Sequence, residues 1–248
     1  MLDFFIKRSK VVIDCFTNNL NAFDYFPIKE SKNFYPEWWK AASKTYPVAE
    51  SSGIVVDKAT IKTCDGLIDL YQQGFMLPLW SDLVVETNAD GFKYSFADEI
   101  SEIGSHDYNQ MTTEFIQYIH FKIISPWGIR EKQGIKFMFM QPSYNHVKTL
   151  TNWHILPGVV DFKHQHATNI NFLAHRARRY QIAAGHPLAH LIPLTDKEVE
   201  LKLHVVDPMN PEHQRVKNNF YPFFKGSHKK IKKLISEKEK ASCPFFKK

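Results

Sequence analysis

A series of short apolar segments between residues 117 and 206 constrains the fold of this chain more than any other feature. The segments are separated by turn residues, and several alternate apolar with polar side chains, as in GIKFMFMQP and VELKLHVV. Strands that recur at intervals of about 8–12 residues are typical of β-sandwiches and barrels. We expect residues 125–128, Ser-Pro-Trp-Gly, to form one of the turns. The region therefore predicts a mainly β core.

The first 115 residues predict a mixture of helices and strands. Residues 10–16, KVVIDCF, are typical of a strand, and two short helices are expected, one after Pro36 and one that ends before Gly74. The segments DLVVET and FKYSF flank an Asp-Gly turn and predict a hairpin. Residues 45–60 and 97–114 are expected to be irregular connections. The chain is thus predicted to have an N-terminal α/β elaboration packed on the core (1–115), a β core (116–207) and a helical Lys-rich tail (208–248).

The positive charge of the chain is concentrated at its C-terminus. The whole sequence carries a net charge of +6, and residues 225–248 alone contain nine lysines against two glutamates, so the remainder is close to neutral. A lysine-rich helix of this kind is usually solvated, and its charges can also attract nucleic acid or an acidic partner. We expect any such contact to be made by the tail and not by a face of the fold.

The composition indicates the kind of cellular compartment in which the chain works. No run of eighteen apolar residues occurs, so a membrane-spanning helix is not expected. Charges at Lys7, Arg8 and Lys10 interrupt the apolar stretch that a secretory signal needs. The three cysteines have no CxxC spacing, which favours a reducing compartment over a disulfide framework or a zinc site.

Three turns in the β region resemble those of the dUTPase and dCTP deaminase superfamily. Pro142-Ser143-Tyr144-Asn145 stands where that superfamily has a phosphate-contacting Pro-Arg-Ser-Gly-like motif. The sequence PGVVD at 157–161 resembles its Gly-(Val/Ile)-(Ile/Val)-Asp, and GHPLAHLI at 185–192 resembles its Gly-Asp-Arg-Ile-Ala-Gln-Leu-Ile. The three follow in the family's order at close to its spacing. The resemblance implies a jelly-roll or β-clip core and a trimeric assembly.

The resemblance also marks candidate site residues. It implies ligand-binding positions at Ser143, Asn145, Asp161 and Asn171, with Asp161 as the candidate catalytic residue. Asn171 falls where dCTP deaminases have a catalytic Glu, and an amide does not relay a proton as a carboxylate does. The Tyr, Arg and Gly that follow the Asp in active dUTPases are also replaced. The fold-forming positions are therefore kept while the catalytic ones are changed.

The chain as a whole is similar to a family of uncharacterised proteins associated with marine bacteriophages. The similarity rests on the phrases EWWK, GFMLPLWSDLVVE, ISPWGI, LPGVVD and AGHPLAHLIP. Together with the replaced catalytic positions, it predicts a phage-encoded, non-enzymatic structural or binding protein without a cofactor. We expect it to self-associate, as a trimer, and to reside in the host cytoplasm or the virion.

An enzyme is the alternative prediction. A divergent nucleotide hydrolase or deaminase-like protein would rely on Asp161. A cupin-like oxygenase would rely on His164 and His166, which are two residues apart and therefore share one face of a strand, with His190 as a third ligand. That arrangement would hold iron or another divalent metal.

Overall fold

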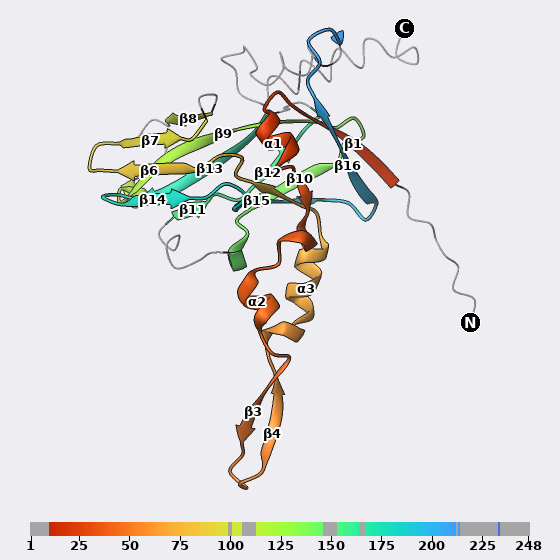
Figure 1. Ribbon diagram of the computed structural model, residues 1–248, viewed down its shortest axis with the longest axis vertical. Coiled ribbons are helices and arrows are strands. Elements are labelled where there is room, and N and C mark those ends of the chain that lie inside the picture. Colours follow the sequence, from red (N-terminus) through yellow and green to blue (C-terminus); the bar gives the residue numbers. More distant parts are fainter. Residues whose placement is uncertain are drawn as a thin grey trace, which may run out of the picture.

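The protein is mainly β, as its alternating segments predicted. A computed structural model describes residues 10–98, 101–105, 113–145, 153–163, 167–211, 213 and 233. Its strands form a six-stranded sheet, a five-stranded sheet, a three-stranded sheet and a separate two-stranded hairpin (Figure 1). The predicted Lys-rich helical tail falls almost entirely outside the described residues.

The six-stranded sheet has the order β11-β13-β9-β1-β16, and β8 also pairs with β9. Its pairs are antiparallel except for β1 and β16, which run parallel from Lys10 opposite Glu198 to Thr17 opposite Val205. The strand bounds are β1 (Lys10–Thr17), β8 (Glu102–Ser105), β9 (Tyr118–Arg130), β11 (Trp153–Ile155), β13 (Ala167–His175) and β16 (Glu198–Val205).

The five-stranded sheet has the order β12-β10-β15-β5-β2 and is antiparallel throughout. Three segments that the sequence analysis singled out, 142–145, 157–161 and 185–192, belong to three neighbouring strands of this sheet: they lie after β10, in β12 and over most of β15. The strand bounds are β2 (Lys29–Glu30), β5 (Phe75–Pro78), β10 (Lys136–Met140), β12 (Gly158–Asp161) and β15 (Pro187–Pro193).

The predicted hairpin of residues 83–96 forms the third sheet, in the order β14-β6-β7. Short helices join the strands, and α2 and α3 lie near the base of the separate β3–β4 hairpin (Figure 1). The bounds are β3 (Thr45–Ala49), β4 (Val55–Ala59), β6 (Leu83–Thr87), β7 (Phe92–Phe96), β14 (Arg179–Ile182), α1 (Leu20–Asp24), α2 (Glu37–Ala41), α3 (Asp65–Gln72) and the 3-10 turns η1 (Ser31–Phe34), η2 (Ile61–Thr63), η4 (Thr113–Phe115) and η5 (Ser143–Asn145).

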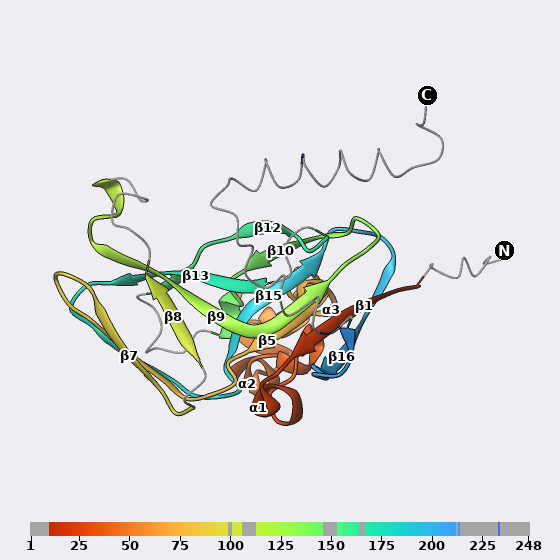
Figure 2. The same cartoon turned by 90° about the horizontal axis from the view of Figure 1, so that it is seen from above.

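One hydrophobic core joins the sheets. Alternate side chains of β1 and β9, such as Ile13 and Phe121, meet side chains of β10 and β15, such as Phe137 and Leu191, and all four are essentially inaccessible to solvent. Strands from before and after residue 116 pair within the same sheets. Seen from above, β1 and β16 lie at one end of the molecule and β7 at the other (Figure 2).

Three local predictions were wrong. Residues 45–60 are not an irregular connection, because β3 and β4 pair over five residues each. Part of the expected loop 97–114 is strand β8, which pairs with β9. The expected turn at 125–128 lies inside β9, which continues to Arg130 because β1, far away in sequence, pairs with its second half.

Gly74 connects α3 to β5 in a conformation that only glycine adopts easily. Its φ is +67°, and a Cβ there would overlap the backbone carbonyl oxygen of Leu191 in the neighbouring strand β15. Gly134 has a similar φ of +85° but no atom near its would-be Cβ. Alanine at Gly134 therefore meets only the backbone strain of a positive φ, whereas alanine at Gly74 meets both that strain and a steric overlap.

We expect Gly74→Ala to destabilise the protein much more than Gly134→Ala. The left-handed backbone should cost both variants about 1–2 kcal/mol, and the overlap with Leu191 should add about 1–3 kcal/mol to Gly74→Ala alone. Urea unfolding of both variants measures the difference. Equal losses would show that β15 moves away from the added methyl group freely.

Candidate functional site

The predicted ligand-binding residues do not converge on one pocket. Asp161 pairs with Lys136 at the start of β10, whereas Ser143 and Asn145 belong to η5, which follows the end of that strand. The rise along β10 separates the two positions by roughly 13 Å. The Asp161 side chain is partly buried, and its Oδ1 accepts a hydrogen bond from the Lys163 backbone at 3.2 Å. That contact is typical of a carboxylate that stabilises a turn.

Asn171 lies in the other large sheet, opposite Lys122 of β9. Its backbone carbonyl accepts a hydrogen bond from Leu156 at 3.0 Å. Its side-chain Oδ1 is buried and accepts no hydrogen bond within the described part of the chain. Asn171 and Asp161 therefore belong to different sheets and do not form a shared site.

Two of the predicted residues do meet, at a tyrosine that the sequence analysis did not single out. The hydroxyl of Tyr71 in α3 donates a hydrogen bond to Oδ1 of Asn145, and Nδ2 of Asn145 donates to the Phe34 carbonyl at 2.8 Å. His190 of β15 lies against the other side of Tyr71, with ring centroids 6.4 Å apart. The Nε2 of His190 is 2.6 Å from the carbonyl oxygen of Gln73.

A column of stacked rings continues outward from Tyr71. Tyr35 stacks on Tyr71 with centroids 4.6 Å apart, and Trp39 of α2 stacks on Tyr35 at 4.3 Å. The Lys62 ammonium lies 4.2 Å above the Trp39 ring and donates hydrogen bonds to the last carbonyls of α2. This arrangement, which we call the aromatic column, connects the buried His190 to the base of the β3–β4 hairpin.

Burial sets the protonation states inside the column. Desolvation raises the pKa of Tyr71 above its ordinary value of 10.0, so its hydroxyl keeps the proton that it donates to Asn145. Desolvation lowers the pKa of His190 below 6.5, and the Gln73 carbonyl opposes that shift only in part. A neutral His190 that bonds a backbone carbonyl is a structural residue in this setting.

The predicted metal ligands can be placed only in part. His164 and His166 lie outside the described residues. His190 is 1% exposed and makes the contacts given above. No group of three or more His, Cys, Asp or Glu side chains suited to a metal ion occurs among the residues that the structure describes.

The β3–β4 hairpin, which we call the arm, extends away from the sheets (Figure 1). Among the described strands, its two pair only with each other. Tyr46, Ile54 and Val55 are 48%, 62% and 64% exposed. An isolated two-stranded hairpin is at best marginally stable in water, and exposed apolar patches are typical of contact surfaces.

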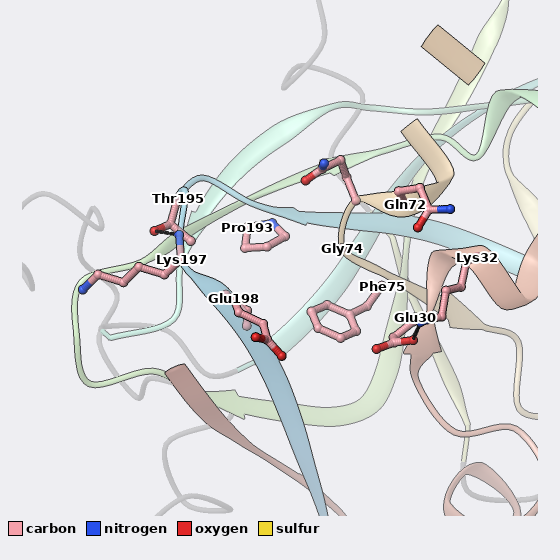
Figure 3. A pocket seen from close by; sticks show the side chains of 11 residues that line it. Glu30, Lys32, Gln72, Gly74, Phe75, Pro193, Thr195, Lys197 and Glu198 are labelled. Atoms are coloured by element: carbon pink, nitrogen blue, oxygen red, sulfur yellow. Dashed lines mark hydrogen bonds and ion pairs between the residues drawn. The ribbon is translucent and has the colours of Figure 1, made fainter. Parts of the chain in front are cut away.

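A groove lies where the last described strands of the two larger sheets, β16 and β2, approach each other. Two adjoining hollows of about 380 and 510 Å³ form it, and both are lined by Glu30, Phe75, Glu198 and Val199. The Phe75 ring lies between the side chains of Glu198 and Glu30 (Figure 3). The groove has an apolar floor and a rim that carries both signs of charge.

The sequence held a weak signal for the arm and none for the column or the groove. Alternation in TYPVA and IVVDKA is visible in retrospect, but Pro47 argues against an ordinary strand. The column joins residues 35, 39, 71, 145 and 190, and no local pattern reveals that they meet. The groove depends on which strands end each sheet, which is a property of topology alone.

No family model and no curated protein matches the chain. Among the described helices, none has the length and apolar character required to cross a membrane.

Tyr71→Phe should lower the free energy of unfolding by about 1–3 kcal/mol, because Oδ1 of Asn145 loses its donor in a buried setting. Tyr25→Phe is the matched control, since Tyr25 is exposed and its hydroxyl makes no described contact with the column. Urea denaturation of the two variants provides the comparison. A loss no greater than that of the control would show that this hydrogen bond contributes little to stability.

The stability of the protein should fall on acidification through the titration of His190. The folded state holds the pKa of His190 below 6.5, so the unfolded chain binds the proton more readily, and stability is lost as the pH falls below about 6.5. His190→Gln removes this contribution while keeping an N–H donor for Gln73. Thermal unfolding at pH 7.5 and pH 5.5 should show a smaller drop for the variant. The same drop in both proteins would contradict the assignment.

Proposed function

We propose that this chain is a phage-encoded, non-enzymatic structural protein that assembles with copies of itself through the arm. In this proposal the core descends from a dUTPase-like jelly roll whose catalytic positions have been replaced. The observation that carries the proposal is the arm itself, which exposes large apolar side chains on a hairpin with no core beneath it. Such a surface is usual for a protein that is complete only as an assembly.

The arrangement of the three superfamily-like segments supports the dUTPase-like part of the proposal. Phe139 of β10 lies opposite Gly158, and Met140 lies opposite His190 of β15. The turn before β15 contains Gly185, whose φ of +82° explains the glycine at that place in the motif. Segments separated by tens of residues in the sequence thus border one set of adjacent strands.

The environments of the former catalytic positions support a non-enzymatic role. Asp161 bonds its own turn, Asn145 bonds Tyr71 and Phe34, and Asn171 lies in a different sheet. General acid–base or nucleophilic chemistry needs at least two such groups within hydrogen-bond reach of one substrate. These residues instead hold segments of the chain together.

The column supports a role for the arm as a fixed projection. Trp39 and Lys62 brace its base, and Trp38 Nε1 donates to the Tyr144 carbonyl at 2.9 Å, which ties α2 to η5. The backbone pair formed by Thr60 N–H and Lys44 carbonyl, at 2.9 Å, closes the arm at its base. A hairpin held in this way can bind a neighbour without first losing entropy on being ordered.

Shortening the arm should abolish self-association. We would replace residues 45–59 with Asn-Gly, a two-residue turn that suits the retained Lys44–Thr60 pair. Sedimentation velocity should show oligomers of the full chain, a trimer being expected, and a monomer with unchanged circular dichroism for the variant. Met209→Asp, which alters an exposed apolar residue outside the arm, should leave the oligomer intact.

Four results would contradict this proposal. An oligomer that survives loss of the arm, or a full chain that stays monomeric at high concentration, would remove the assembly role. Release of pyrophosphate or ammonia from deoxynucleoside triphosphates would favour the nucleotide enzyme. Stoichiometric iron that is lost on replacing His164 and His166 would favour the oxygenase.

A further inference from the structure

We propose that the groove of one copy receives the arm of another, with β4 added as a new parallel strand beside β16. This inference rests on the proposed function, because it names the surface that the arm binds. It commits to a second copy of this chain as the occupant. Three observations carry it: the outer edges of β4 and of β16, neither of which pairs with another described strand, and the apolar surfaces that parallel pairing brings together.

The outer edge of β4 is competent for strand pairing, whereas that of β3 is blocked. Glu50 N–H donates to the Ile54 carbonyl at 2.8 Å, and hydrogen-bonded pairs alternate along an antiparallel hairpin. Val55, Asp57 and Ala59 therefore direct their backbone groups away from β3. On β3 the corresponding central position is Pro47, which has no N–H to offer.

Among the described strands next to the groove, β16 has the longest outer edge to which another strand can be added. β16 has eight residues and pairs only with β1 among the described strands. Val206 N–H, just after β16, donates to the Thr17 carbonyl at 2.8 Å. By alternation along the strand, Val199, Leu201 and Leu203 direct their backbone groups away from β1. An exposed edge of this length is a template for strand addition from another chain.

The side chains of the two edges suit each other. Val199, Leu201 and Leu203 are partly buried against the core and form the groove floor with Ile28 and Phe75. On the arm, the register places Tyr46 opposite Lys58 and Val48 opposite Val56, so Tyr46, Val48, Ile54 and Val56 share one face. Adding β4 beside β16 lays this face on the apolar floor.

The arm and the groove are different surfaces of the molecule, so the contact is heterologous. Each copy gives an arm to one neighbour and receives an arm from another. Such contacts generate a ring when the rotation closes, and an open filament when it does not. A closed ring of three satisfies every arm and every groove.

Disulfide trapping tests which strand receives the arm. Cys64 and Cys243 are first replaced by Ser, and the buried Cys15 is retained. Chains with Asp57→Cys are then mixed with chains that carry Glu198→Cys, Glu200→Cys or Lys202→Cys, all exposed on β16. At least one mixture should give a crosslinked heterodimer in high yield. Val159→Cys, exposed on the edge strand β12, is the matched control.

The outcomes separate this inference from the proposed function. If shortening the arm dissociates the oligomer while no crosslink forms at β16, the arm binds elsewhere and only this inference is contradicted. Trapping at Val159→Cys in place of β16 would lead to the same conclusion. If the oligomer does not depend on the arm at all, both the inference and the proposed function are contradicted.

Discussion

The stacking of Tyr35 on Tyr71, whose ring also contacts the buried His190 at a tilted angle, is the interaction that links the arm to the rest of the structure. It joins the outer face of the five-stranded sheet to the helical segments that cover it, and Trp39 and Lys62 extend the contact to the base of the arm. Around it, α2 and α3 are held by a small cluster in which aromatic rings pack on the buried Leu67 and Met76. The direction of the arm depends on this cluster.

The same contacts place two of the residues that the sequence analysis marked as site candidates. Asn145 is hydrogen-bonded through both its amide oxygen and its amide nitrogen, to Tyr71 and to the Phe34 carbonyl. Burial lowers the pKa of His190, and its ring bonds the Gln73 carbonyl. Both side chains therefore help to hold the helical segments at the base of the arm.

The sequence predicted some features of the fold well and others poorly, for identifiable reasons. The β6–β7 hairpin was clear because Asp-Gly punctuates two alternating segments, and α3 was clear because Gly74 ends it. The full length of β9 was missed, because residues 125–128 have a turn-like composition and are held extended by β1. The arm was missed because Pro47 lies on its solvent-facing edge, where a proline costs no hydrogen bond.

The sequence by itself determined that this chain is mainly β and where most of its strands begin and end. These are consequences of local alternation and turn chemistry, which act over a few residues. Only the tertiary structure decided that Asp161 and Asn145 lie apart, that Asn145 and His190 meet at Tyr71, and that β16 and β2 border a groove. Those arrangements depend on which strands become neighbours, and that choice is made by burying side chains that are distant in sequence in one shared core.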